Sequence, residues 1–278
     1  MYEQSFKFGQ AIIVSGSRSC VGTSTAAAMI ASTLANGGEK VLLLTTDYTH
    51  PTDATSLLSD AVVENHMDEL VALENSSGLT PENLEDYTTY LTDNLAYTRL
   101  STKLSSITRD VPRTLSRIMD TACRVYRYVV LDLDYQSAVY LRKLSEQADI
   151  VALMFGQDFH SLAVAKAMKA QEQSDTGALL VPVLMNALED IPFNDELLAK
   201  SIGADMAFTI EHDAEVYKAA QKRDIAGFVA RGKNKAGLKG LFKKRSADDE
   251  PESAAQVSFK GLCDLIKEAL AAETGGEA

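Results

Sequence analysis

The sequence is poor in cysteine and has no tryptophan. Its 278 residues include three cysteines, Cys20, Cys123 and Cys263, and four histidines. The cysteines are far apart and form no CxxC pair, and the histidines show no spacing typical of metal ligands. The sequence therefore indicates neither a disulfide framework nor a zinc site.

Long apolar runs and an excess of positive charge are also lacking. No uncharged apolar run approaches the roughly 18 residues that a membrane helix needs. The first ten residues lack the basic-then-apolar order of a signal peptide. The 27 Lys and Arg residues stand against 39 Asp and Glu, so the net charge is −12 and argues against broad nucleic-acid binding. We therefore expect a cytoplasmic protein.

Short apolar runs alternate with longer amphipathic stretches through most of the chain. The runs expected to be buried strands are residues 11–14, 41–44, 128–131, 150–155, 179–185 and 206–210. Helical spacing is found between them, over residues 23–35, 111–126 and 160–173. This alternation predicts an α/β fold, a mostly parallel sheet flanked by helices on both faces. We expect it to form a nucleotide-binding domain over residues 1–228.

The remaining residues differ in composition from this domain. Residues 229–253 are first basic and then acidic, which is typical of a solvated linker. From Phe259 to Leu270, apolar residues recur with helical spacing. Residues 254–278 are therefore expected to form an amphipathic helix with a frayed tail.

The basic part of the linker, residues 231–245, has two interpretations. It carries seven basic residues and no acidic one. On a helix, Leu238, Leu241 and Phe242 would form a small apolar face edged by cations, the pattern of an interfacial membrane anchor. The alternative is a flexible basic linker that contacts the protein's own acidic surface. The first interpretation predicts a weak contact with the membrane.

The most informative segment runs from the first expected strand through a loop of small residues into a helix. Small residues allow successive N–H groups to point inward, and the helix N-terminus adds partial positive charge, so this geometry suits phosphate. The P-loop pattern GxxxxGK[ST] is matched in part, by Gly22 and by the hydroxyl of Ser24. Thr23 replaces the lysine, and Ser17 stands at the first glycine. A plain connecting turn is the alternative.

This loop, SGSRSCVGTSTAA, resembles the deviant Walker A loop of the MinD/ParA ATPases, whose pattern is KGGxGK[ST]. Arg18 replaces the signature lysine, which in the family reaches the partner subunit's phosphates. The run Gly-Thr-Ser-Thr is typical of the TadZ/CpaE pilus-assembly branch. The resemblance implies that the loop binds ATP with Mg²⁺ through Ser17, Ser19, Cys20, Val21, Gly22, Thr23, Ser24 and Thr25.

Two further segments resemble the acidic motifs of this family. VLLLTTDYTHP is similar to the second strand and switch I, which implies that Asp47 lies near the attacking water. YVVLDLD resembles the Walker B-like strand, which implies that Asp132 joins Ser24 in the magnesium shell. Taken alone, each aspartate could simply cap a loop or helix. Asp134 could be a cap or an outer-shell acid.

Two later segments resemble the family's base-binding motifs and extend the resemblance over about residues 10–227. LVPVLMNALED ends its strand at Asn186, which implies a contact with adenine. FTIEHDAEVYKAA is similar to the segment IPxDxxVxxA beside the base, with Ile210 and Asp213 at matching positions. Glu211 replaces the proline of that pattern. Judged without the resemblance, an asparagine at the end of a buried strand is more often structural than functional, so the role of Asn186 rests on the resemblance.

The missing lysine shapes the expected function. A P-loop lysine neutralises the β- and γ-phosphates, so its replacement by Thr23 predicts nucleotide binding with slow hydrolysis. The resemblance implies an ATP-dependent homodimer joined through Arg18, with protein partners in a pilus, secretion or other positioning system. Such a protein would be cytoplasmic, or peripheral at the inner face of the cell membrane.

Three functions follow from this interpretation. The first is a TadZ/CpaE-like switch that positions a cell-envelope machine such as a tad-type pilus or secretion system. The second is a MinD-like membrane-cycling ATPase in division or flagellar placement. The third is a nucleotide-free pseudo-ATPase scaffold. DNA partitioning of the ParA type is disfavoured by the net charge.

Overall fold

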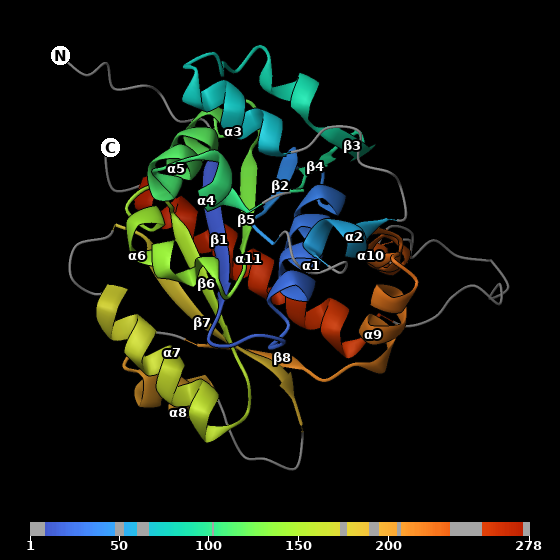
Figure 1. Ribbon diagram of the computed structural model, residues 1–278. Coiled ribbons are helices and arrows are strands. Elements are labelled where there is room, and N and C mark those ends of the chain that lie inside the picture. Colours follow the sequence, from blue (N-terminus) through green and yellow to red (C-terminus); the bar gives the residue numbers. More distant parts are fainter. Residues whose placement is uncertain are drawn as a thin grey trace, which may run out of the picture.

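A sheet with the strand order β3-β4-β2-β5-β1-β6-β7-β8 forms the centre of the computed structural model (Figure 1). The structure describes residues 9–47, 53–59, 67–101, 103–172, 177–188, 195–204, 207–233 and 252–274. The strands are β1 (Gln10–Gly16), β2 (Val41–Thr45), β3 (Thr89–Thr92), β4 (Leu95–Thr98), β5 (Tyr128–Leu133), β6 (Ile150–Phe155), β7 (Leu179–Ala187) and β8 (Phe208–Glu211). The helices are α1 (Thr23–Asn36), α2 (Ala54–Leu58), α3 (Met67–Asn75), α4 (Leu104–Ile107), α5 (Val111–Ala122), α6 (Leu141–Leu144), α7 (Phe159–Glu172), α8 (Asp195–Ile202), α9 (Ala214–Gln221), α10 (Ile225–Lys233) and α11 (Ala254–Thr274). Within the described ranges, no helix is both long and apolar enough to cross a membrane.

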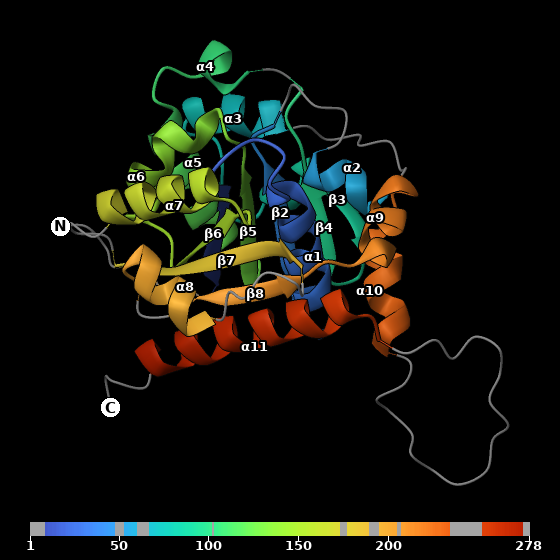
Figure 2. The same ribbon diagram turned by 90° about the horizontal axis from the view of Figure 1, so that it is seen from below.

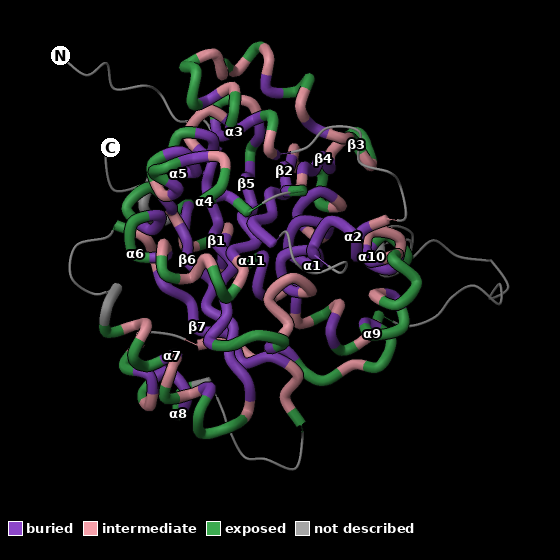
Figure 3. The backbone as a smooth tube through the Cα atoms, viewed as in Figure 1, coloured by how far each residue is buried: buried purple, intermediate pink, exposed green. Residues whose placement is uncertain are grey.

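The sequence of β1 explains its place in the middle of the sheet. The strand is buried along its whole length and pairs in parallel with β5 and β6. Ile12 and Val14 pack against one layer of helices, and Ala11 and Ile13 pack against the other. A parallel strand covered on both faces needs apolar residues at successive positions, and β1 supplies them. Figure 3 shows this burial in the central strands, whereas the outer turns of the helices are exposed.

Two layers of helices cover the sheet. Helices α1, α2, α9, α10 and α11 share one apolar core with one face of the sheet, and Figure 2 shows α11 running along this face beside β8. Helices α3, α5 and α6 form the core on the other face, and α7 and α8 extend this layer over β6 and β7. The predicted α/β fold, with a mostly parallel sheet between helices, is therefore confirmed.

The elements differ from the prediction in three places. The hairpin of β3 and β4 was not predicted; it is antiparallel, turns at Asp93 and Asn94, and joins the sheet at an edge. The helix expected over 111–126 ends at Ala122, because Cys123 caps it and the chain turns back toward β5. The strand predicted over residues 206–210 forms as β8, which begins at Phe208 and ends one residue later than predicted, at Glu211. Met206 lies outside the described residues.

The C-terminal helix is part of the main core. Phe259, Leu262 and Ile266 of α11 are fully buried against the sheet and α1. The domain boundary expected after residue 228 falls inside α10, and the helix expected within 254–278 forms as α11. Most of the predicted linker and the end of the tail, residues 234–251 and 275–278, lie outside the described residues.

Candidate functional site

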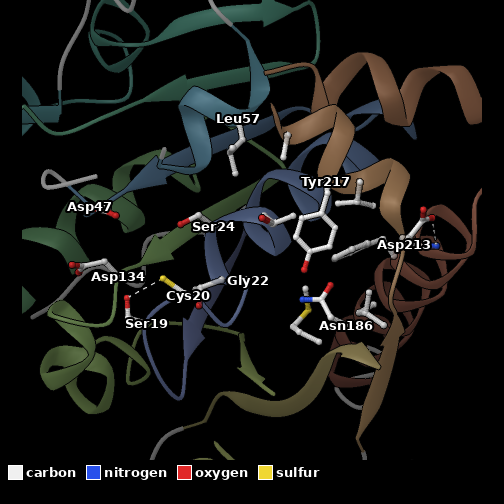
Figure 4. A pocket seen from close by; sticks show the side chains of 18 of the residues that line it. Ser19, Cys20, Gly22, Ser24, Asp47, Leu57, Asp134, Asn186, Asp213 and Tyr217 are labelled. Atoms are coloured by element: carbon white, nitrogen blue, oxygen red, sulfur yellow. Dashed lines mark hydrogen bonds between the residues drawn. The ribbon is translucent and has the colours of Figure 1, made fainter. Parts of the chain in front are cut away.

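A cavity of about 630 Å³ lies beside the N-terminus of α1, where β1, β2, β5, β7 and β8 end. Figure 4 shows Ser19 and Cys20 of the loop before α1 at one end of it and Tyr217 and Asp213 at the other. Asn186 lies close to Gly22, because a Cβ there would stand 3.8 Å from the Asn186 Nδ2. Most of the predicted site residues line it: Arg18, Ser19, Cys20, Gly22, Thr23, Ser24, Thr25, Asp47, Asn186, Ile210 and Asp213. The fold therefore brings together residues that lie almost 200 positions apart in the sequence.

The backbone of the loop explains its small residues. Gly22 precedes α1 with a φ of 104°, a region that residues with a Cβ rarely adopt, and a Cβ there would lie 3.2 Å from the Met185 Cε. A Cβ on Gly16 would collide with the Thr23 hydroxyl. Cys20 has a φ of 60°, a left-handed backbone conformation that residues with a Cβ rarely adopt. The loop thus turns sharply at the end of β1 and leads directly into the helix.

The first turn of α1 is suited to an anion. The first N–H groups of a helix have no partner inside the helix and carry partial positive charge. Gly22 provides no side-chain cap for them, and the first turn holds no acidic residue. Ser24 and Thr25, which both carry hydroxyls, lie in the same turn and line the cavity. A phosphate group placed here would meet donors and no opposing carboxylate from the helix.

Ser17 and Val21 do not line the cavity. Ser17 is fully buried, and its Oγ lies 2.8 Å from the Oγ of Ser161 on α7. The Ser161 Oγ also accepts a hydrogen bond from the N–H of Gly156. Val21 is buried in the core beneath the loop. These two residues therefore anchor the loop to the turn between β6 and α7 and to the core, rather than presenting side chains to the cavity.

Asp132 is the most perturbed acid near the loop. It lies at the end of β5, is fully buried and does not line the cavity, and its Oδ1 has no hydrogen-bond partner. The Oδ2 atom accepts a hydrogen bond of 3.3 Å from the Thr45 hydroxyl. Burial raises the pKa of Asp132 from 3.8 to about 7; the Ser24 hydroxyl opposes this, and the charges of Asp53 and Asp47 add to it.

These features fit a divalent cation. A buried carboxylate oxygen without a partner, next to a serine hydroxyl and other acids, is an oxygen-rich site that gains from a positive charge. No group of three or more His, Cys, Asp or Glu side chains in the described part of the chain is arranged to hold a metal by itself. Mg²⁺ is usually held by one or two protein ligands together with phosphate oxygens, so this arrangement suits it.

Asp47 and Asp134 stand at the same end of the cavity. Asp47 is largely buried, and its N–H donates to the Thr45 hydroxyl at 3.2 Å. Asp134 accepts from the N–H of Ser137 at 2.9 Å and from the Thr46 hydroxyl at 3.2 Å, so it caps the turn after β5. Its carboxylate also lines the cavity, so the cap does not remove it from the site.

Arg18 lies at the mouth of the cavity and is half-exposed. Its Nη2 pairs with the Oδ2 of Asp158 at 3.1 Å. Asp158 also accepts, through Oδ1, from the N–H of Ser161 in the first turn of α7. Among the described residues, Arg18 and Arg223 are the cationic side chains that line the cavity, and no lysine does.

Known structures share this arrangement of strands and helices. No family model matches the sequence, and no curated protein matches it. The ParA family ATPase of Chlorobium tepidum is 14% identical, with a TM-score of 0.70 over 92% of this chain and 98% of that one. MinD of Pyrococcus furiosus is 16% identical, with a TM-score of 0.70 over 94% and 99%. MinD of Pyrococcus horikoshii, in complex with Mg-ADP, is 17% identical, with a TM-score of 0.68 over 93% and 95%. The chain has the fold of these ATPases.

Within this ATPase fold, Asp213 has a structural task. Its Oδ1 accepts from the N–H of Glu215 at 2.8 Å and so caps α9. Its Oδ2 accepts from the N–H of Ala255 at 3.2 Å in the first turn of α11. Burial opposes the ionised form, but the hydrogen bonds from Ser253, Glu215 and Ala255 prevail and lower the pKa of Asp213. Asp213 therefore holds α9 and α11 together at the far end of the cavity.

Sequence reasoning missed several residues at this far end. Tyr217 of α9 and Ala255 and Phe259 of α11 all line the cavity. Phe259 was predicted only as part of an apolar helical stripe, and no role was predicted for Tyr217. The signal for Tyr217 is its place one helical turn after Asp213, on a segment already thought to lie beside the base. No comparable signal links α11 to the loop.

Proposed function

We propose that this chain is an ATP-binding switch that hydrolyses ATP slowly or not at all and dimerises in its ATP state. In this proposal the switch positions a cell-envelope machine such as a tad-type pilus or secretion system. The observation that carries the proposal is the loop at the cavity, which retains Gly22 and Ser24 of a phosphate-binding loop while Thr23 replaces its lysine.

In this proposal the nucleotide spans the cavity. The phosphates lie against the loop and the first turn of α1, and the base lies toward Asn186 and Ile210. Ser24 and Asp132 hold Mg²⁺, which when bound neutralises charge on the phosphate oxygens. The unpartnered Oδ1 of Asp132 supports this role, because a cation would satisfy a buried atom that has no other partner.

Slow hydrolysis follows from the charges at the loop. Thr23 keeps a hydroxyl but removes the point charge that stabilises the transferring phosphoryl group. Asp47 lies at the edge of the cavity and is the proposed residue that orients the attacking water. A long-lived ATP state suits a switch, because its dimer must persist long enough to recruit a partner.

Several exposed residues support a dimer through the mouth of the cavity. Arg18 and Asp158 form a pair of opposite charges at the surface, and such a pair is self-complementary across a two-fold axis. Phe159, next to Asp158, is 92% exposed, and Val139, in the turn after β5, is 77% exposed. The backbone of Leu188, another exposed apolar residue, is hydrogen-bonded to the Gln157 side chain beside this pair.

The positioning role rests on the resemblance to the TadZ/CpaE branch and on the fold. MinD of Aquifex aeolicus forms a complex with MinC. By analogy, this chain would recruit a protein partner of a pilus, secretion or other positioning system. A MinD-like membrane cycle is the alternative, and it would require the basic segment 231–245 to bind lipid. Only residues 231–233 of that segment, at the end of α10, are described.

Titration with Mg-ATP, recording both heat and molecular mass, tests the proposal. We expect heat of binding and a doubling of mass, and we expect Arg18→Ala to keep the heat but lose the dimer. Arg124→Ala is the control, because Arg124 also forms an exposed ion pair, with Asp120 on α5 outside the cavity. Absence of heat at millimolar nucleotide would leave the nucleotide-free scaffold as the function. An ATP-induced dimer unchanged by Arg18→Ala would refute the role of that residue.

Sedimentation with anionic vesicles separates the switch from the membrane cycle. ATP-dependent sedimentation that is lost on Phe242→Glu would favour the MinD-like cycle, because two anchors in a dimer bind far better than one. Equal sedimentation with and without ATP, or none at low salt, would leave the segment as a linker.

A further inference from the structure

The far end of the cavity contains an aromatic side chain that none of the roles above uses. Tyr217 is 50% exposed although it lines the cavity. Figure 4 shows its ring projecting from α9 into the space between the loop and Asp213, with the hydroxyl directed toward Asn186. An exposed aromatic ring inside a cavity is an open contact surface for a flat ligand.

The position of this ring is set by its neighbours. Asp213 caps α9, and Tyr217 follows one turn later on the same helix. The ring of His212 lies 5.5 Å from that of Tyr217, at an interplanar angle of 44°. His212 is not among the residues that line the cavity, so it supports the tyrosine from outside. The tyrosine ring is thus supported by a capped helix and a second ring.

The surroundings of Tyr217 match the chemistry of a nucleobase. Met185, Ile210 and Phe259 are buried apolar side chains that line the same cavity. The Asn186 amide offers both a donor and an acceptor, which can read the edge of a base. Both carboxylate oxygens of Asp213 already accept backbone hydrogen bonds from α9 and α11. This residue is therefore better suited to fix the two helices in place than to contact the ligand.

We propose that Tyr217 is the base-contacting residue of this site. The nucleobase stacks on its ring, and Asn186 hydrogen-bonds the base edge. Asp213 and His212 are positioning residues that act through the tyrosine. This inference rests on the proposed binding of ATP, and it specifies which part of the nucleotide each end of the cavity recognises.

Two probes separate the base from the phosphates: Mg-ATP, and Mg-tripolyphosphate, which lacks base and ribose. With the full chain, Tyr217→Ala should weaken ATP binding by roughly 5- to 100-fold, the range expected for loss of one stacked base. It should leave tripolyphosphate binding unchanged, and Tyr217→Phe, which keeps the ring, should retain the affinity for ATP. Lys218→Ala is the matched control, because Lys218 is the next residue on α9, is exposed and does not line the cavity.

A spectroscopic signal tests stacking directly. Because the chain has no tryptophan, Tyr217→Trp introduces a single indole at the proposed contact. ATP should quench its fluorescence and tripolyphosphate should not, whereas Tyr90→Trp on β3, outside the cavity, should respond to neither. ATP affinity unchanged by Tyr217→Ala in a folded protein, or an equal loss for both probes, refutes this inference alone. Failure of both probes to bind the unmodified chain refutes the nucleotide site and this inference with it.

Discussion

Replacing Asp132 by asparagine should stabilise the nucleotide-free protein at alkaline pH. Asp132 is fully buried at the end of β5, its Oδ1 has no hydrogen-bond partner, and burial raises its pKa to about 7. Above pH 7 the folded chain must therefore hold a poorly compensated negative charge. Asparagine has a similar shape and carries no charge at any pH.

The sign and the size of the effect follow from the two pKa values. In the unfolded chain Asp132 ionises near its ordinary value of 3.8, and in the folded chain near 7. Between these values the folded state binds more protons, so the free energy of unfolding decreases as the pH rises from about 4 to about 7. At about 1.4 kcal/mol per pH unit, this interval corresponds to a loss of about 4 kcal/mol as an upper bound. The Asp132→Asn variant avoids this loss.

Urea unfolding at pH 5 and pH 8, without nucleotide and with a chelator, measures the effect. The advantage of Asp132→Asn should be up to about 1.5 kcal/mol at pH 5 and should rise to as much as about 4 kcal/mol at pH 8. Asp120→Asn is the control, because Asp120 forms an exposed pair with Arg124 whose loss should cost about 0.5 kcal/mol or less at either pH. Parallel pH profiles of the unmodified chain and Asp132→Asn would refute the reasoning. Mg-ATP should reverse the order, because the variant lacks the proposed metal-binding carboxylate.

Three further predictions concern the loop and the cavity wall. Thr23→Lys should raise the rate of phosphate release, because it restores a charge beside the phosphates; an unchanged or lower rate would contradict this. Cys20→Gly should raise the thermal midpoint by roughly 1–3 °C, because a φ of 60° costs a residue with a Cβ about 1 kcal/mol; a lower midpoint would contradict it. Phe259→Ala should destabilise the protein by about 3–5 kcal/mol in urea and weaken ATP binding. Val257→Ala, at a residue 54% exposed on the same helix, should change stability by about 0.5 kcal/mol or less.

The sheet was largely predictable because its long strands are buried on both faces. Strands β5 and β6 carry apolar residues at nearly every position, and β1 does so over residues 11–14; such runs stand out in the sequence. The hairpin of β3 and β4 was missed for a physical reason. Strand β3 has four residues that alternate between partly buried and exposed, so it forms no apolar run, and its pairing depends on the neighbouring strand.

The site was predictable where the chain is locally constrained. The turn from β1 into α1 needs small residues, and these residues indicated its place in the sequence. The direction of each side chain was not predictable in the same way. The loop motif predicts the same ligand-binding role for Ser17 and Ser19. In the structure, however, the Ser17 side chain is buried against Ser161, whereas Ser19 lines the cavity. Only the packing of the loop against α7 separates these roles.

Contacts between distant segments were beyond sequence reasoning. The apolar stripe of α11 predicts a buried helix face, but not which face of the sheet it covers. Phe259 therefore could not be linked to a loop more than 200 residues earlier. The same holds for the hydrogen bond from Ala255 to Asp213, which adds the support of two helices to the predicted role of this acid.

The position of α11 in the chain determines when the apolar surface of α1 is covered during translation. Helix α11 follows every strand, yet it covers α1, and the Cys263 Sγ lies 3.9 Å from the Ile30 carbonyl oxygen. At about 5–20 residues per second, a ribosome needs roughly 10–50 s to travel from α1 to the end of α11. During this interval α1, at the end of the loop after β1, still exposes to water the apolar surface that α11 later covers. The nascent chain would be open to chaperones at this surface and would acquire the complete cavity only as translation of α11 ends.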